Sequence, residues 1–314
     1  MTGARVLVTG SSGFVGTHLM AGLIESGADV YGLDRSGGGS CFCGDLRSGP
    51  FLLGVLRETR PTHVIHLAGV LPGAGHDAVT LYEENVLNTV RLLEGIRVSA
   101  ADIKVLVASS SAVYGDTRPE ENPLSEDRPF RPITEYGVSK AAQEIAVLQQ
   151  HLAHGLRAVR LRTFNLVGQG QSSQLLLPAL AHQIARAEHE PGPIVVHAGN
   201  LDSRRDFVDV RDAVRAYVGL AERGAPGEVY NVCGGRGRSA RECVDLFARL
   251  VNRPIRVECD EALVRRVEIA DQVGDATRLR ETTGWRPEIP FEESLRDVLN
   301  EWRERVRVER EVAR

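Results

Sequence analysis

Apolar and polar positions follow two alternating periods along the first two-thirds of the chain. Short runs of consecutive apolar residues are typical of buried strands, and the stretches between them repeat apolar residues every three to four positions, as amphipathic helices do. The strand-like runs are residues 5–9, 29–34, 63–68, 104–110 and 157–164, and the helical stretches lie near residues 14–26, 50–60, 80–99 and 134–153. Strands that alternate with helices predict a parallel sheet with helices on both faces. The expected fold class is therefore α/β, a doubly wound parallel sheet.

A glycine-rich segment, TGSSGFVG, follows the first strand-like run and places Gly10, Gly13 and Gly16 at intervals of three residues. In a strand–turn–helix context, the first glycine permits a tight turn, the second lets the backbone approach a pyrophosphate, and the third lets the helix pack closely on the strand. A helix that begins near Phe14 and Val15 directs its amide groups at the phosphates. We expect these five residues to contact a dinucleotide in a Rossmann domain.

An acidic residue, Asp34, ends the second strand-like run. Its carboxylate can accept hydrogen bonds from both hydroxyls of the adenosine ribose, and it would repel a 2′-phosphate. The position therefore favours NAD over NADP, although the neighbouring Arg35 leaves NADP possible. The alternative interpretation is that Asp34 only caps a turn.

Two further segments suit a dinucleotide site. Asp45 and Leu46 are expected to hold the adenine amino group and to pack against its ring. Leu67, Ala68 and Gly69 end the third strand-like run, where the backbone of the cofactor must pass. The histidines of that run, at positions 63 and 66, are interpreted as packed strand residues rather than catalytic ones.

The alternation of strand-like and helical patterns becomes less regular after residue 165, where loops rich in glycine, proline and serine separate shorter elements. Residues 207–232 again indicate a helix followed by a strand. We predict an NAD(P)-binding Rossmann domain over residues 1–165, to which residues 207–232 return, and a smaller carboxy-terminal α/β lobe that binds the substrate, made of residues 166–206 and 233–314. The tail from Phe291 is interpreted as a charged helix with a solvated face. The lobe should cover the carboxyl edge of the sheet, where ligands of such folds bind.

A tyrosine and a lysine, Tyr136 and Lys140, lie four residues apart in the segment YGVSK. This spacing places the phenol and the ammonium on one face of a helix. A nearby cation favours phenolate, so the sequence predicts a lowered pKa for Tyr136 and a role in proton exchange with a sugar hydroxyl or carbonyl. The chain has only two lysines among 38 basic residues. Ser110 and Ser111, at the end of the run 104–110, can contact the same reacting oxygen.

Composition narrows the possible partners. A formal net charge of −4 and a pI near 6.2 argue against a nucleic-acid partner. No apolar run reaches the roughly 18 residues that cross a bilayer, and the chain begins directly with a strand-like run rather than a signal peptide. The five cysteines form no CxxC pair and no metal-ligand cluster. We therefore expect a cytoplasmic protein with reduced thiols and no metal site.

Together these motifs resemble the extended short-chain dehydrogenase/reductases, the NAD-dependent epimerase/dehydratase family, over nearly the whole chain. The resemblance implies that Ser110, Tyr136 and Lys140 are catalytic and that Lys140 also binds the nicotinamide ribose. It further implies substrate contacts for Ser110, Ser111 and Tyr136. By the same resemblance Phe164 borders the nicotinamide, and the residues implied to hold the diphosphate of a sugar nucleotide are Asn165, Arg205 and Arg265. The alternative for Arg205 is a surface salt bridge.

Within this family, the segments at residues 164–172, 199–207 and 273–297 are most similar to the branch that contains GDP-4-dehydro-6-deoxy-mannose reductases and GDP-mannose dehydratases. The dehydratases carry a carboxylate shortly after the catalytic hydroxyl, whereas this chain has Ser111 and Ala112 there. The resemblance thus implies a nucleotide-sugar 4-ketoreductase that uses NAD or NADP. A 4-epimerase that retains NAD is the alternative, and a dehydratase or a non-catalytic NAD sensor is less favoured. It also implies a homodimer formed through the helices near residues 80–99 and 134–153.

Overall fold

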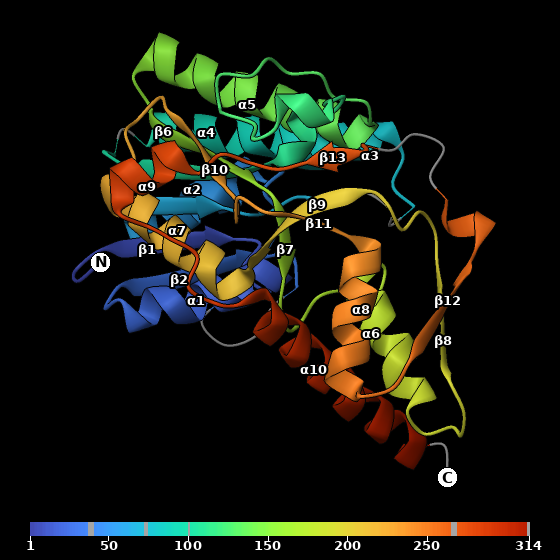
Figure 1. The fold of residues 1–314 in the computed structure, drawn as a ribbon. Coiled ribbons are helices and arrows are strands. Elements are labelled where there is room, and N and C mark those ends of the chain that lie inside the picture. The colour runs from blue at the N-terminus through green and yellow to red at the C-terminus, as the bar shows by residue number, and fades with distance from the viewer. Residues whose placement is uncertain (37–40, 72–74, 100, 265–268, 313–314) are drawn as a thin grey trace.

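The central sheet of the computed structural model consists of seven parallel strands in the order β10-β6-β5-β4-β1-β2-β3 (Figure 1). The structure describes residues 1–36, 41–71, 75–99, 101–264 and 269–312. The strands are β1 (Arg5–Thr9), β2 (Asp29–Asp34), β3 (Cys41–Cys43), β4 (His63–His66), β5 (Lys104–Ser110), β6 (Arg157–Thr163) and β10 (Val229–Val232). The strand order reverses between β1 and β4, so the ligand crevice of such a sheet lies at the carboxyl ends of these two strands. The predicted α/β fold class is confirmed.

Helices cover both faces of this sheet, as the alternating pattern predicts. One face packs against α1 (Phe14–Glu25) and α7 (Val210–Arg223), and the other against α2 (Gly49–Thr59), α4 (Asn88–Val98) and α5 (Glu135–His154). In Figure 1, α4 and α5 lie above the sheet and α1 and α7 lie below it. The inner strands therefore bury apolar residues on both sides, which explains the continuous apolar runs in the sequence.

The helix expected near residues 80–99 is divided into three pieces. A short helix, α3 (Ala78–Tyr82), continues into a π-helical turn over Glu83–Leu87 and then into α4. Asn85 lies in the π turn, where its side chain accepts a hydrogen bond from the amide of Val70 at 2.9 Å and donates one to Ser139 Oγ at 3.1 Å. The extra residue of a π turn is a local irregularity that apolar spacing does not reveal.

The second lobe contains two small sheets and three long helices. Its strands are β7 (Asn165–Val167), β9 (Arg204–Asp209), β11 (Gly237–Ser239) and β13 (Asp271–Gln272) in one sheet, and β8 (Ile194–Ala198) and β12 (Ile255–Cys259) in the other. Its helices are α6 (Leu176–Ala187), α8 (Ala240–Val251) and α10 (Phe291–Val312). These helices enclose an apolar core of their own. Short 3-10 turns cover Ser111–Val113, Pro119–Glu121 and Glu261–Leu263.

The carboxy-terminal helix α10 differs from the expected solvated charged helix. Its exposed face is charged, but Leu295, Val298, Leu299 and Trp302 are buried against α6 and α8. The helix is therefore amphipathic and closes the core of the lobe. A further short helix, α9 (Thr277–Thr283), packs on α7 and β10. Among the described residues, no helix has both the length and the apolar character needed to cross a membrane.

A buried ion pair joins α5 to the sheet. Glu144 on α5 accepts two hydrogen bonds from Arg162 Nε on β6, at 3.0 and 3.1 Å, and a third from Arg162 Nη2 at 3.0 Å. Oxygen Oε1 of Glu144 also accepts from Ser109 Oγ on β5 at 2.6 Å. Arg162 lies against the ring of Tyr114, 4.9 Å from its centroid. One carboxylate thus connects α5 with two neighbouring strands.

We predict that Glu144→Ala lowers the free energy of unfolding by about 3–5 kcal/mol, because it leaves the buried guanidinium of Arg162 without its partner. Chemical denaturation monitored by circular dichroism measures this loss. Glu58→Ala on α2, an exposed carboxylate, is the control and should change stability by less than about 0.5 kcal/mol. Equal effects of the two substitutions would show that the buried pair adds nothing specific.

Candidate active site

The glycine-rich segment forms the turn between β1 and α1. Gly10 has φ +73°, a left-handed conformation that glycine adopts without strain, and a Cβ there would lie 2.7 Å from the amide nitrogen of Ala68. A Cβ at Gly16 would lie 2.2 Å from the carbonyl oxygen of Gly10. Gly13 is the N-cap of α1, and among the described residues no side chain caps this helix and no acidic residue occupies its first turn. The amide of Gly13 donates to the carbonyl oxygen of Gly10 at 3.2 Å, so the amides of Phe14 and Val15 are the ones that suit a phosphate.

Asp34 ends β2 directly beside this turn. Its Oδ2 accepts hydrogen bonds from the amide and the hydroxyl of Ser12, at 3.1 and 2.6 Å, and its Oδ1 accepts from the amide of Arg35 at 2.7 Å. Burial alone would raise the pKa of Asp34, but these hydrogen bonds outweigh it and lower the pKa. The carboxylate is thus ionised at neutral pH. Arg35 Nη1 lies 3.3 Å from Glu84 Oε1, so its charge is partly balanced.

The other expected dinucleotide contacts lie at the same edge of the sheet. The amide of Leu67 donates a hydrogen bond to the carbonyl oxygen of Thr9 at 3.0 Å, which continues the pairing of β4 with β1. Ala68 and Gly69 come next, and the backbone of Ala68 lies beside Gly10. The carboxylate of Asp45 is bound by Arg47, with contacts of 2.9 and 2.6 Å. Leu46, which follows it, is buried in the core on the α2 side of the sheet. The adenine contacts of Asp45 and Leu46 stay predictions.

The fit to a dinucleotide rests on these shapes. Side chains at the first and third glycines would collide with backbone, so these positions bring the turn close to α1 and β4. The turn carries the uncapped amides at the start of α1, and its Ser12 contacts the ionised Asp34. Phosphates and a ribose are the groups that such donors and acceptors hold. The residues present therefore fit a nicotinamide dinucleotide.

The three residues expected to be catalytic come together at the carboxyl end of β5. Ser110 is the last residue of β5, and its hydroxyl accepts from the amide of Ala112 at 3.2 Å. Tyr136 lies in the first turn of α5, which begins after Thr134, whose hydroxyl caps it through the amide of Gly137 at 3.0 Å. Ser110 lies close enough to the phenol of Tyr136 to lower its pKa. The hydroxyl of Ser110 and the phenol of Tyr136 therefore lie next to each other at the carboxyl edge of the sheet.

The electrostatics of Tyr136 differ from the expectation. Burial raises the pKa of Tyr136 to about 12, and the group that lowers it is Ser110 rather than Lys140. The physical reason is that the ammonium of Lys140 is held elsewhere. It donates to the carbonyl oxygen of Ala108 on β5 at 2.7 Å and to Gln143 Oε1 at 2.8 Å. Within the chain itself, Tyr136 is a phenol at neutral pH, and the expected lowering of its pKa by Lys140 was wrong.

Sequence patterns missed the residues that surround Lys140. Gln143 accepts a hydrogen bond from Lys140 and donates one to Thr89 on α4. Thr89 in turn forms a hydrogen bond with His66 on β4. His66 is buried, as its interpretation as a packed residue expects, and burial lowers its pKa to about 3, with a smaller effect from Lys140. The one available signal was a polar residue on the apolar face of α5, at position 143.

Ser111 has a structural partner in the second lobe. Its hydroxyl donates to Gln272 Oε1 on β13 at 2.9 Å, and Gln272 Nε2 donates to the carbonyl oxygen of Ser111 at 3.1 Å. Both residues are buried. The expected substrate contact of Ser111 stays a prediction, and its hydroxyl already serves to join the catalytic strand to β13.

The expected diphosphate residues lie on neighbouring strands of the lobe. Asn165 on β7 pairs with Phe207 on β9 and donates from Nδ2 to the carbonyl oxygen of Asp206 at 3.3 Å. Arg205 is on β9 and donates to the carbonyl oxygen of Arg204 at 2.8 Å. Phe164, expected at the nicotinamide, is 3% exposed. Arg265 lies outside the described residues, so its expected role stays a prediction.

The buried carboxylate of Asp206 ties the loops around these strands together. It accepts hydrogen bonds from the amides of Gly234, Gly235 and Gly274 at 2.7, 2.9 and 3.1 Å. Burial raises its pKa to about 6, against the opposing effect of these amides. The alternative role for Arg205 is a salt bridge with Asp206 or Asp209; backbone amides engage Asp206, and Arg211 binds Asp209 at 2.9 Å.

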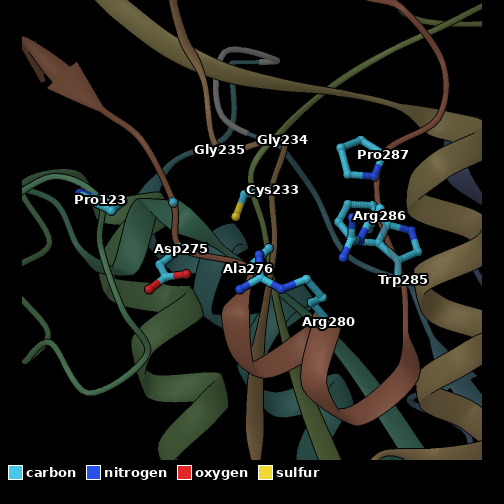
Figure 2. A pocket seen from close by; sticks show the side chains of 11 residues that line it. Pro123, Cys233, Gly234, Gly235, Asp275, Ala276, Arg280, Trp285, Arg286 and Pro287 are labelled. Atoms are coloured by element: carbon cyan, nitrogen blue, oxygen red, sulfur yellow. The ribbon is translucent and has the colours of Figure 1, made fainter.

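A cavity of about 250 Å³ opens at the carboxyl end of β10. Figure 2 shows Asp275 on one side of it and Trp285 with Arg286 on the other. Its lining includes none of Ser110, Tyr136 and Lys140. This cavity is therefore distinct from the cluster of the three residues predicted to be catalytic. No cluster of His, Cys, Asp and Glu among the described residues could hold a metal ion.

Comparisons with known proteins identify the family and the fold. The model of the NAD dependent epimerase/dehydratase family matches residues 6–233. A GDP-6-deoxy-D-mannose reductase of Pseudomonas aeruginosa is 36% identical over 307 residues, which cover 97% of this chain and 99% of that protein. The solved structure of RMD from Pseudomonas aeruginosa complexed with NADPH has a TM-score of 0.86 and 35% identity, covering 96% of this chain and 99% of that chain. A UDP-glucose 4-epimerase of Thermus thermophilus in complex with NAD has a TM-score of 0.83 and 29% identity, covering 95% and 99%.

We predict that the chain binds NAD(H) more tightly than NADP(H), and that Asp34→Ala shifts the ratio of the two dissociation constants toward NADP(H) by about tenfold, since it removes a negative charge facing a 2′-phosphate. Isothermal titration calorimetry with both dinucleotides measures the ratio. Asp29→Ala, at the other end of β2, is the control and should leave the ratio unchanged. A wild-type preference for NADP(H) would mean that Arg35 determines the selectivity.

Proposed function

Since the chain belongs to the NAD-dependent epimerase/dehydratase family, we propose that it is a 4-ketoreductase of a GDP-linked 4-keto-6-deoxy-mannose. It is an NAD(P)-dependent enzyme of the extended short-chain dehydrogenase type. The observation that carries the specific reaction is the similarity to a GDP-6-deoxy-D-mannose reductase along nearly the full length of both proteins.

The proposed reaction adds a hydride and a proton to the C4 carbonyl of the sugar. A reduced nicotinamide dinucleotide, held at the glycine-rich turn and Asp34, would supply the hydride to the carbonyl carbon. Tyr136 donates its phenolic proton to the carbonyl oxygen, and Ser110 holds that oxygen by a hydrogen bond. A phenol with a pKa of about 12 is protonated at neutral pH, which is the form that ketone reduction requires. Lys140, whose ammonium is held away from the phenol by Ala108 O and Gln143 Oε1, is assigned to the nicotinamide ribose.

Dehydration is disfavoured by the residues after Ser110. The removal of water needs an acid or base in this position, and the chain has Ser111 and Ala112 there. The hydroxyl of Ser111 is already bound to Gln272. No carboxylate therefore follows the proposed catalytic hydroxyl directly.

The lobe would hold the nucleotide diphosphate of the substrate. Arg205 and Asn165 stand on β9 and β7, whose residues pair in register. A diphosphate needs charge-assisted donors, and a guanidinium presents two parallel N–H groups to phosphate oxygens. We assign Arg205, Asn165 and Arg265 to this contact as part of the same proposal.

A second candidate function is 4-epimerisation with retained NAD, which the similarity to a UDP-glucose 4-epimerase favours. The same three side chains serve both reactions, because an epimerase also moves a proton at the C4 oxygen. The two reactions differ in their net consumption of the reduced dinucleotide. A reductase consumes one reduced dinucleotide per turnover, whereas an epimerase consumes none.

We also propose a cytoplasmic homodimer. All five cysteines are free thiols, as a reducing compartment maintains them. Large apolar side chains stand exposed on the helices expected to pair, with Ile145 and Leu152 of α5 at 57% and 73% exposure and Val98 of α4 at 63%. Contact between two copies through this face would remove that surface from water.

The reaction is tested by incubating the chain with GDP-4-keto-6-deoxy-mannose and NADH or NADPH, and by following loss of the reduced dinucleotide and a product two mass units heavier. Tyr136→Phe should lower the rate by about 10²–10⁴-fold, since it removes the proton donor, while the dissociation constant for NAD(H) changes only a few-fold. Tyr82→Phe, a partly exposed tyrosine of α3, is the control. Interconversion of UDP-glucose and its C4 epimer without net loss of the dinucleotide would instead establish the epimerase, and an undiminished rate of Tyr136→Phe would refute the assigned proton donor.

The dimer predicts a mass of twice 34.2 kDa in light scattering at micromolar concentration. Ile145→Glu combined with Leu152→Glu should yield the monomer, because each places a charge in the apolar contact. Leu263→Glu, an exposed apolar residue of the lobe, should leave the dimer intact. A wild-type chain that scatters as a monomer contradicts the proposal.

A further inference from the structure

Lys140 is held from two sides before any ligand reaches it. Its ammonium donates one hydrogen bond to Ala108 O at 2.7 Å and a second to Gln143 Oε1 at 2.8 Å. An ammonium has three N–H groups. Among the described residues, these two contacts leave one N–H without a protein acceptor. Both Lys140 and Gln143 are buried, so solvent does not substitute for either contact.

The orientation of the Gln143 amide follows from the proton of Thr89. Thr89 Oγ1 donates its single proton to the carbonyl oxygen of Asn85 at 2.7 Å. It therefore has only acceptor capacity for Gln143 at 2.7 Å, which must present Nε2 to it. The carbonyl oxygen of Gln143 consequently faces Lys140. A flipped amide would point N–H groups at an ammonium.

The same logic extends to β4 and β1. His66 is neutral, since burial lowers its pKa to about 3, and it has one ring N–H. Thr89 Oγ1 has no proton left for His66, so His66 Nε2 donates to it at 2.9 Å. His66 Nδ1 then accepts from Thr9 Oγ1 at 2.6 Å. Thr9 precedes Gly10, so the chain of hydrogen bonds ends at the turn that fits the dinucleotide.

We propose that Gln143 is a positioning residue, which fixes the ammonium of Lys140 between β5 and the buried Thr89–His66–Thr9 chain and aims its third N–H at the ligand crevice. The apolar spacing of α5 would place an aliphatic side chain at this buried position. An amide there satisfies two groups at once, because it accepts from Lys140 and donates to Thr89. The proposal rests on the proposed function only in giving Lys140 a part in turnover.

The charge on Lys140 depends on few neighbours. The titratable groups that interact with it are Glu144 on α5 and the neutral His66 on β4, while α4 and β5 contribute uncharged donors and acceptors. Burial lowers the pKa of Lys140 to about 8, and Glu144 opposes this effect. Glu144 is itself paired with Arg162 on β6. A change in what Gln143 offers should therefore shift the titration of Lys140.

The chain has only two lysines, so this titration can be observed directly by NMR of protein labelled with ¹³C at lysine Cε. Gln143→Met keeps the shape but removes the acceptor, so the pKa of Lys140 should fall by about one unit. Gln143→Glu adds a negative charge, so the pKa should rise. Lys104, at the amino end of β5, is the internal control, and Lys104→Arg assigns the two signals. Gln149→Met, exposed on α5, is the matched control variant.

The pH profile of turnover gives a second readout. Its alkaline limb should move to lower pH in Gln143→Met and to higher pH in Gln143→Glu, following the proton of Lys140. A purely structural glutamine would lower the unfolding temperature in both variants and leave the Lys140 titration unchanged, and that result overturns the proposal. If the wild type fails to reduce the GDP sugar, the proposed function fails, while the NMR titration still decides the role of Gln143.

Discussion

A buried ion pair between Glu144 and Arg162 sets where the reactive side chains stand. Glu144 lies one helical turn after Lys140 on α5, so whatever fixes Glu144 also fixes Lys140 and, one turn earlier, Tyr136. The same carboxylate accepts from the hydroxyl of Ser109, which immediately precedes the end of β5. Charges are costly to bury unless they are paired and hydrogen bonded. Because this buried carboxylate needs its hydrogen-bond partners, it fixes α5 at a constant distance from β5 and β6.

The guanidinium extends the same constraint beyond the helix. Arg162 also donates to Tyr114 at 3.1 Å and to the carbonyl oxygen of Glu126 at 2.9 Å, and the Tyr114 hydroxyl donates to Asn231 on β10 at 2.6 Å. Asp206 acts similarly in the lobe, where one buried carboxylate collects amides from two loops. The site thus lies between two networks, each centred on a buried acid. Fully satisfied buried networks are rigid, so the loops attached to them hold fixed positions around a ligand.

The sequence predicted those parts of the molecule that local patterns encode. Apolar periodicity located the main strands and helices, and the spacing of Gly10, Tyr136 and Lys140 placed the two halves of the site, because turn, strand and helix geometry act over a few residues. The residues that Gln143 connects to Lys140 were missed, since Thr89 and His66 are 51 and 74 positions away from Lys140 along the chain and carry no motif. The shift in the pKa of Tyr136 was predicted in the wrong direction. Helical spacing shows that Lys140 is near, but it does not show that the ammonium donates to the carbonyl oxygen of Ala108.

The bond between Ser111 and Gln272 spans 161 positions of the chain. On the ribosome, the strand that ends in Ser110 emerges long before β13, so the residue next to the proposed catalytic hydroxyl waits for its partner until most of the polypeptide has been made. Strand β10 likewise joins the sheet late, beside β6. A nascent or truncated chain can thus form the glycine turn and the first parallel strands while its reactive edge is still incomplete.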